Sequence, residues 1–168
     1  MLDHSLDAAR AHCDGVVLVV AAEHLDRLEP HADAVVAGGS TRSESVRAGL
    51  AVVPGDADRV LVHDAARPWA DAAVWRRVLD GLDTGADAVV PAVPVVDTLR
   101  EVGGGTVDRG RFVAVQTPQG FRAEALRRAH AGEPDGTDDA SLVEAVGGMV
   151  LLVDGDPANR KITTPADL

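Results

Sequence analysis

Residues 15–22, Gly15-Val-Val-Leu-Val-Val-Ala-Ala22, form an unbroken apolar run. A strand covered on both faces has this pattern, whereas a strand with one solvated face alternates between apolar and polar residues. Similar short runs follow at residues 34–37, 59–63, 86–91 and 149–153. Between the runs, apolar residues keep helical spacing at 2–13, 41–53, 75–82, 124–130 and 141–146. This alternation of strands and helices predicts a doubly wound α/β fold with a mostly parallel sheet.

Length and composition favour one domain over residues 1–168. A chain of 168 residues can bury a single core, and 46% hydrophobic with 26% charged residues excludes wholesale disorder. The net charge of −11 disfavours nucleic acid and anionic membranes as partners. Cys13 is the only cysteine, no apolar run is long enough to span a bilayer, and the first residues lack the apolar core of a secretory signal. We therefore expect a cytoplasmic protein.

Residues 95–115 depart from the strand–helix alternation. They alternate between apolar and polar residues and pivot on Gly103-Gly104-Gly105. This pattern is typical of a β-hairpin, and we expect it to protrude from the sheet as an arm. An ordinary antiparallel edge of the sheet fits the pattern equally well.

Polar residues follow two of the predicted strands. In open α/β sheets, ligands bind beyond the carboxyl ends of the strands. Gly38-Gly39-Ser40 precedes a helix, so its amides are candidates for binding an anion, although a plain turn explains them too. Asp64 ends the 59–63 run and suits a divalent cation or substrate hydroxyls, while Arg67 suits a phosphate. A structural pairing of Asp64 with Arg67 is the alternative, and His63 is more typical of a structural residue.

Further candidates lie later in the chain. Thr117 and Thr137 offer hydroxyls at the same edge, where they equally suit turns and caps. Lys161 is the only lysine, and its ammonium could steady a phosphoryl group in transfer. The sequence contains no G-x-G-x-x-G, G-x-x-x-x-G-K-[ST] or G-x-S-x-G motif and no paired His/Cys arrangement for zinc. Dehydrogenase, P-loop and hydrolase functions therefore lose their main support.

In order and separation, these segments resemble the 2-C-methyl-D-erythritol 4-phosphate cytidylyltransferases of the non-mevalonate isoprenoid pathway. The resemblance extends from about Leu2 to Leu168. It rests on Gly38-Gly39-x-x-Arg42-x-x-Ser45-Val46-x-x-Gly49-Leu50, Val62-His63-Asp64-Ala65-Ala66-Arg67-Pro68, Asp97-Thr98, Arg109, Gln116-Thr117-Pro118-Gln119-x-Phe121, Thr137-Asp138-Asp139-Ala140-Ser141 and Asn159-x-Lys161-Ile162-Thr163.

The resemblance implies transfer of a cytidylyl group from CTP to methylerythritol phosphate, with release of pyrophosphate and assistance from Mg²⁺. It places the nucleotide on Gly38, Gly39, Ser40, Ser45 and Asp64, with Asp64 also on the metal. It places the acceptor on Arg67, Thr98, Arg109, Thr117, Thr137 and Lys161. Catalysis falls to Lys161, Arg109 and Asp64. A homodimer is implied as well, in which the 95–115 arm carries Thr98 and Arg109 into the partner's site.

The sequence departs from the family pattern in two places. Ser40 stands where the family more often has an acid. The family's opening glycine-rich loop, with its arginine and lysine, is not found ahead of Leu2, so we expect an N-terminally truncated domain with weak unaided activity. The same motifs serve ribitol 5-phosphate cytidylyltransferases. An impaired homologue acting as a binding or dimerisation protein is a third alternative.

Overall fold

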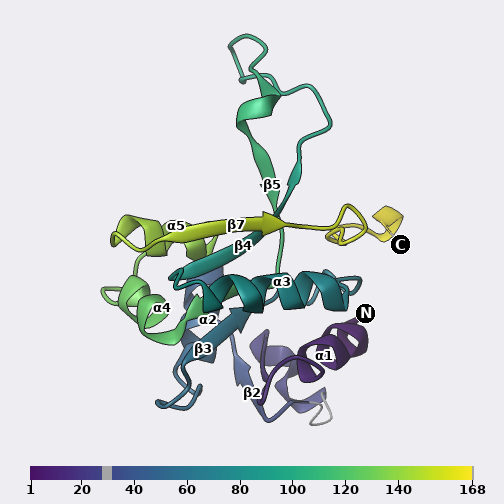
Figure 1. The fold of residues 1–168 in the computed structure, drawn as a ribbon. Helices are drawn as coiled ribbons and strands as arrows, with labels where there is room; N and C mark the ends of the chain where they lie inside the picture. Colours follow the sequence, from purple (N-terminus) through teal and green to yellow (C-terminus); the bar gives the residue numbers. More distant parts are fainter. Residues whose placement is uncertain (28–31, 168) are drawn as a thin grey trace.

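The computed structural model describes residues 1–27 and 32–167, which form a mixed α/β fold as the alternating pattern predicted (Figure 1). The helices are α1 (Leu2–Arg10), α2 (Arg42–Leu50), α3 (Ala72–Asp83), α4 (Ala123–His130) and α5 (Asp139–Ala145). The strands are β1 (Val17–Val20), β2 (Ala34–Ala37), β3 (Arg59–Val62), β4 (Ala88–Pro94), β5 (Val113–Val115), β6 (Gln119–Arg122) and β7 (Val150–Asp154). Short 3₁₀ turns occupy Ala22–Arg27, Arg109–Arg111 and Pro165–Asp167.

The described strands form two sheets. β1 pairs in parallel with β2. In the five-stranded sheet, β4 pairs in parallel with β7, but β3–β6, β4–β6 and β4–β5 are antiparallel. The prediction of a mostly parallel sheet is therefore wrong for the five-stranded sheet, since three of its four pairings are antiparallel. The reason is that β5 and β6 return along β4, and β6, Gln-Gly-Phe-Arg, has no apolar run that would announce a strand.

Helices cover both faces of the five-stranded sheet. Successive residues of a strand point to opposite faces. Val90 of β4 accordingly lies in a buried cluster with Leu126 of α4 and Val143 of α5. Its neighbour Val89 lies in a second cluster with Val78 of α3. The helical stripe predicted for residues 75–82 is confirmed as the buried face of α3.

A cleft separates the two sheets. It has a volume of about 1340 Å³ and is lined by β1, by β3 and by one side of α2 from its first residue to its last. Leu6 of α1 packs with Leu18 on the β1–β2 sheet in a separate small core. The carboxyl ends of β1, β2 and β3 open onto this cleft, so that residues following β2 and β3 share one cavity.

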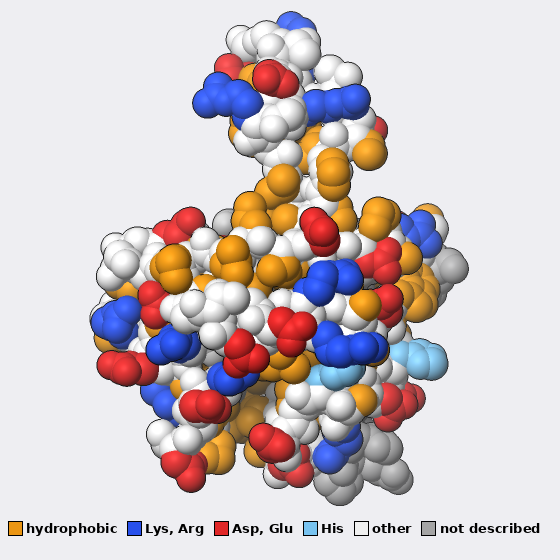
Figure 2. All heavy atoms as spheres, viewed as in Figure 1, with side chains coloured by type: hydrophobic (Ala, Val, Ile, Leu, Met, Phe, Trp, Pro, Cys, Tyr) orange, Lys and Arg blue, Asp and Glu red, His pale blue; other side chains and the backbone are white. Residues whose placement is uncertain are grey.

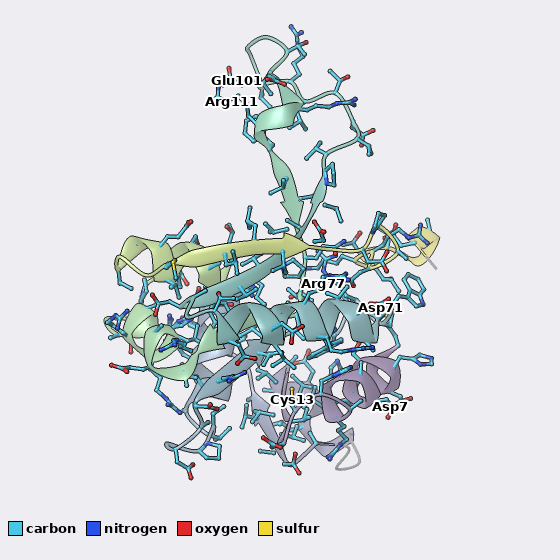
Figure 3. All side chains as sticks on the ribbon, viewed as in Figure 1. Asp7, Cys13, Asp71, Arg77, Glu101 and Arg111 are labelled. Carbon is cyan, nitrogen blue, oxygen red and sulfur yellow. The ribbon has the colours of Figure 1, made fainter. Side chains whose placement is uncertain are left out.

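Residues 95–112 project from the body as an arm (Figure 1). Strand pairing in this segment is limited to its base, where β4 meets β5, and to one isolated bridge between Arg100 and Thr106. The β-hairpin predicted over 95–115 is therefore paired only at its base and at this bridge. Figure 2 shows apolar side chains at the base of the arm and charged ones around its tip, where Figure 3 labels Glu101 and Arg111.

Among the helices of the described residues, none combines the length and the apolar character that crossing a bilayer requires.

Candidate active site

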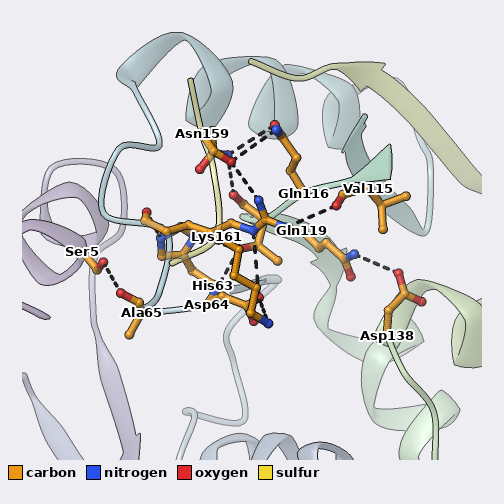
Figure 4. A network of polar contacts seen from close by, with 12 residues as sticks. Ser5, His63, Asp64, Ala65, Val115, Gln116, Gln119, Asp138, Asn159 and Lys161 are labelled. Atoms are coloured by element: carbon orange, nitrogen blue, oxygen red, sulfur yellow. Dashed lines mark hydrogen bonds and ion pairs between the residues drawn. The ribbon is translucent and has the colours of Figure 1, made fainter. Parts of the chain in front are cut away.

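Asp64, Arg67 and Lys161 meet at the end of β3. The Nζ atom of Lys161 lies 2.9 Å from Oδ2 of Asp64 (Figure 4), and Nε of Arg67 lies 3.9 Å from the same oxygen. The Lys161 side chain is 48% exposed, while that of Arg67 is only 13% exposed. Sequence analysis placed these three residues at one edge of the sheet, and the structure brings them together. Asp64 thus forms a close ion pair with Lys161 and a longer charge contact with Arg67.

Arg67 is fixed by backbone carbonyls as well as by Asp64. Its Nη1 donates to the carbonyl oxygen of Asn159 at 2.8 Å, and its Nη2 donates to that of Val115 at 3.4 Å. Burial lowers the pKa of Arg67, while the neighbouring Asp64 carboxylate raises it. An arginine remains protonated despite such a shift. A positive charge is therefore held in place before any ligand arrives.

Two buried amide side chains hold the loop that carries Lys161. Gln116 donates through Nε2 to the carbonyl oxygens of Asp156 and Asn159, at 2.8 and 3.2 Å, and accepts from the Asp156 amide at 3.0 Å. Asn159 is fully buried and donates through Nδ2 to the carbonyl oxygen of Thr117 at 2.9 Å (Figure 4). Both residues belong to the motifs that carry the family resemblance, but the sequence indicated no role for either. The feature of the sequence that could have identified them is an amide side chain in each of two segments that otherwise consist of turn residues.

Thr117 is buried beneath Asp64. The Asp64 amide donates to Thr117 Oγ1 at 3.0 Å, and that oxygen lies 3.2 Å from Nδ1 of His63. Since the hydroxyl accepts from the amide, its own hydrogen points to Nδ1, and the Nε2–H of His63 then donates to the carbonyl oxygen of Arg67 at 3.2 Å. Burial lowers the pKa of His63 to about 4, which keeps the ring neutral. Thr117 therefore acts within the protein as a support for Asp64.

The Gly38-Gly39-Ser40 loop donates its amides within the chain. Gly39 N–H donates to Ser45 Oγ at 3.2 Å, and the amide and hydroxyl of Ser40 donate to Glu44 Oε2 at 2.6 and 2.7 Å. The hydrogen bonds from Ser40 lower the pKa of the Glu44 carboxyl. Glu44 belongs to the capping box with Thr41, which the sequence predicted and the structure confirms. Its carboxylate occupies the position at the start of α2 that sequence analysis reserved for an anion.

The remaining acceptor candidates lie on the 134–138 loop and on the arm. Thr137 is exposed, immediately before Asp138, which caps α5 and accepts from Gln119 Nε2 at 2.9 Å. Thr98 and Arg109 are exposed on the arm, where the Arg109 guanidinium donates to the carbonyl oxygen of Val96. The arm projects away from the body, so the structure does not bring these two residues to Asp64 of the same chain (Figure 1).

The nucleotide candidates share the cleft with Asp64. Gly38, Gly39, Ser45 and Asp64 all line the cavity of about 1340 Å³. Ser45 is held by its own bond to the carbonyl oxygen of Thr41 at 3.0 Å. The loop after β2 and the carboxylate after β3 therefore line the same cleft, beyond the carboxyl ends of these strands.

Asp64 suits a cation that arrives with phosphate groups. Within residues 1–27 and 32–167, no three His, Cys, Asp or Glu side chains are grouped so that they could hold a metal ion. Asp64 offers a single carboxylate, one oxygen of which faces Lys161. Mg²⁺ is commonly bound by one or two carboxylates together with substrate phosphates and waters. The donor set fits a nucleotide-bound divalent cation rather than a separate all-protein metal site.

Comparison with known proteins identifies the family. The family described as "IspD: 2-C-methyl-D-erythritol 4-phosphate cytidylyltransferase" matches residues 1–168. The chain belongs to this family. Among the relatives of the chain is the Rhodococcus jostii 2-C-methyl-D-erythritol 4-phosphate cytidylyltransferase, which is 50% identical over 165 residues; the match covers 92% of this chain and 72% of the relative.

Solved structures of IspD enzymes have the same fold. The Thermus thermophilus 2-C-methyl-D-erythritol 4-phosphate cytidylyltransferase superposes with a TM-score of 0.87 at 36% identity, covering 98% of this chain and 82% of that one. The Anaerococcus prevotii 4-diphosphocytidyl-2C-methyl-D-erythritol synthase has a TM-score of 0.89 at 26% identity, covering 99% and 84%. The resemblance noted from the motifs is thus confirmed over the whole chain.

Proposed function

We propose that this IspD family member transfers the cytidylyl group of CTP to 2-C-methyl-D-erythritol 4-phosphate. The observation that carries the proposal is the cluster of Asp64, Arg67 and Lys161. Its carboxylate residue, Asp64, lines the same cleft as Gly38 and Gly39. Its chemistry suits two phosphorylated ligands, and a relative named for this activity is 50% identical. The chain is therefore a CTP-dependent nucleotidyltransferase.

The reaction needs charge stabilisation more than a protein nucleophile. A phosphate oxygen of the acceptor bonds to the α-phosphorus of CTP, and the bond from that phosphorus to the oxygen bridging to the β-phosphate breaks. That oxygen leaves with its electron pair as part of pyrophosphate. Lys161 and Arg67 supply fixed positive charge near the transferring group. Because Asp64 and two backbone carbonyls already hold these cations, little reorganisation is needed when charge develops.

Asp64 and the nucleotide phosphates together would hold Mg²⁺. When bound, the ion would neutralise part of the negative charge of the phosphates. Asp64 is supported for this role by the bond from its own amide to Thr117, which fixes the backbone where the carboxylate originates. Gly38, Gly39, Ser40 and Ser45 would contact the nucleotide, with Glu44 moving aside or sharing the Ser40 hydroxyl. We place the reaction in the cytoplasm.

We further propose a homodimer in which the 95–115 arm reaches the partner's site. The arm exposes Val96 at 78% and Phe112 at 47%, which is typical of surface that is covered in an assembly. Thr98 and Arg109 would then contact the acceptor bound by the partner, together with Arg67, Thr137 and Lys161 of that subunit. Thr117, whose hydroxyl is already bonded to the Asp64 amide and to His63, would serve the acceptor by supporting Asp64.

The test is a pyrophosphate-release assay with CTP and Mg²⁺. We expect turnover with methylerythritol phosphate that exceeds turnover with ribitol 5-phosphate by at least about tenfold, since acceptor pockets discriminate by bonds to hydroxyl groups. The reverse order would assign the chain to ribitol phosphate. Absence of turnover with both acceptors, with a stable dimer on sizing, would instead favour a binding or dimerisation protein.

A further inference from the structure

A buried carboxylate outside the Asp64 cluster joins three helices. Asp139 begins α5 and is fully buried. Its Oδ2 lies 2.7 Å from Nη2 of Arg42, which begins α2, and its Oδ1 accepts from Nε2 of His130, which ends α4, at 2.9 Å. The three side chains come from segments that meet only in the folded chain. None of them was assigned a role from the sequence.

The carboxylate is charged and depends on its partners. Burial raises the pKa of Asp139, but the hydrogen bond from His130 and the charge and hydrogen bond of Arg42 outweigh it, so the pKa lies below its ordinary value. A buried charge that loses its partner is strongly destabilising, because nothing replaces the lost solvation. Asp139 therefore holds Arg42 and His130 in one arrangement as long as the charge is present.

The same contact region connects two loops of the proposed site. One is the Gly38–Ser40 loop, which runs directly into α2. The other is the loop at 134–138, which carries Thr137. Thr41 donates through Oγ1 to Asp135 at 2.8 Å, the Gly136 amide donates to Ser43 Oγ at 3.0 Å, and Arg47 donates through Nη1 to the carbonyl oxygen of Pro134 at 2.8 Å.

These contacts are directional. The start of α2 bonds to the 134–138 loop through Thr41 and Ser43. Arg42, between these two residues, pairs with Asp139, which directly follows that loop. Both loops are therefore bonded to the first turn of α2. His130 completes the set by fixing the second oxygen of Asp139, and Arg42 itself lines the cleft. A shift of either loop must break bonds to the other.

We propose that Asp139, with Arg42 and His130, is a positioning unit that sets the nucleotide loop and the Thr137 loop together. The inference rests on the proposed function, because it takes Gly38–Ser40 as the nucleotide loop and Thr137 as an acceptor contact. The contacts of the unit are made within the protein, between the starts of α2 and α5 and the end of α4. It acts by making the geometry of each loop depend on the other.

The kinetic test compares Arg42→Gln, Asp139→Asn and their double variant with wild type. Each single variant should raise the KM for CTP and the KM for the acceptor by at least about fivefold, although each substitution lies beside only one loop. The double variant should be no more than about twofold worse than Asp139→Asn, since the two residues act as one unit. Arg42→Lys, which keeps the charge, should recover part of the loss.

Asp83→Asn is the matched control, because Asp83 pairs with Arg59 at 2.8 Å on the surface and lines a different cavity from the proposed site. It should leave both KM values unchanged. A fall in kcat with both KM values unchanged in Arg42→Gln would indicate only a smaller folded fraction and would overturn the inference. So would a rise confined to one substrate. If Asp139→Asn does not fold, the Arg42 variants carry the test, since the Arg42 side chain is 31% exposed.

Amide hydrogen exchange tests the inference without turnover. Arg42→Gln should accelerate exchange at Gly136, and Asp139→Asn should accelerate it at Ser40 and Thr41, while Asp83→Asn changes neither. Exchange that changes only in the substituted loop contradicts the coupling. If wild-type protein shows no turnover with either acceptor, the proposed function fails, and this measurement still decides whether the two loops are coupled.

Discussion

Lys161 is the most exposed cation of the Asp64 cluster, and its contribution is a point charge. Its Nζ lies 2.9 Å from Oδ2 of Asp64, and the side chain as a whole is 48% exposed, so the ammonium is accessible to a phosphate. Removal of one preorganised electrostatic donor costs about 2.7–4 kcal/mol of barrier. We therefore predict that Lys161→Gln lowers kcat by a factor of about 100 or more. Steady-state pyrophosphate release at saturating substrates measures the effect.

The neighbouring Arg160 provides the control for Lys161. Its guanidinium lies over the ring of Trp69, 5.6 Å from the centroid, and is not part of the Asp64 cluster. Arg160→Gln removes the same formal charge one position away and should change kcat by less than about threefold. Equal losses in the two variants would show that only the net charge of the loop matters, which contradicts the role given to Lys161.

His63 makes stability depend on pH. Its pKa falls from 6.5 to about 4 on folding, so the unfolded chain binds the proton more readily between these values. The free energy of unfolding must then decrease as the pH falls from about 6.5 towards 4 and is unaffected by this group above pH 6.5. The loss attributable to His63 is up to about 3 kcal/mol.

Urea unfolding of wild type and His63→Gln across this pH range isolates the histidine from the carboxylates. The wild type should lose more stability than the variant between pH 6.5 and 4, and the two profiles should run parallel above pH 7. Parallel profiles over the whole range would mean that burial does not hold His63 neutral in the folded protein.

At the scale of elements, α3 approaches β6 closely because residue 120 is glycine. A Cβ on Gly120 would lie 2.6 Å from Cγ1 of Val78 and 3.1 Å from Cδ1 of Leu82, both on the buried face of α3. Val78 is a stiff, fully buried side chain, so the helix itself would have to shift. We predict that Gly120→Ala lowers the free energy of unfolding by about 1–3 kcal/mol.

Gly55→Ala serves as the control for Gly120→Ala, because a Cβ at Gly55 meets no atom within 4 Å. Denaturant midpoints at constant m-value give both free-energy changes. Gly55→Ala should fall within about 0.5 kcal/mol of wild type. A Gly120→Ala protein as stable as wild type would show that α3 can move away from the sheet without loss.

Elements with a strong local pattern were predictable, and those set by tertiary contacts were not. The apolar run at 34–37 is β2, and the Thr41–Glu44 signal is the capping box of α2. β6 was missed because Gln119 and Arg122 flank a single aromatic residue; it becomes a strand by pairing with β3 and β4. That insertion also explains why strand direction was mispredicted, since direction depends on partners far along the chain.

The same distinction applies to the site, where the charged residues were predictable and the hydrogen bonds that hold them were not. Asp64, Arg67 and Lys161 were predictable because each follows a strand-like run and carries a charge suited to phosphate chemistry. The bonds between Gln116 and Asn159 span 43 positions, and nothing in either segment alone indicates the partner. Likewise, the sequence predicted the capping box of Thr41 and Glu44. It did not predict that the Glu44 carboxylate also accepts a hydrogen bond from the Ser40 hydroxyl. Sequence patterns locate charges at strand ends; they do not assign the hydrogen bonds that hold them.

At the scale of the whole molecule, the arm separates two groups of acceptor candidates. Lys161 lies on the body, whereas Arg109 lies on the arm with its guanidinium bonded to Val96. A dimer in which each arm serves the partner's site makes a prediction that no monomeric arrangement shares. Subunits with defects in different groups should complement each other when mixed.

Arg109→Gln and Lys161→Gln, each nearly inactive alone, test this arrangement. In a mixed dimer, the Arg109→Gln subunit keeps an intact body and receives an intact arm from the Lys161→Gln subunit, so one of the two sites is complete. Random pairing in equal amounts, after joint denaturation and refolding, should restore about a quarter of wild-type activity, because about half of the dimers are mixed and each has one working site. If each arm served its own subunit, every site in the mixture would lack either Arg109 or Lys161, and activity would stay at the level of the separate variants.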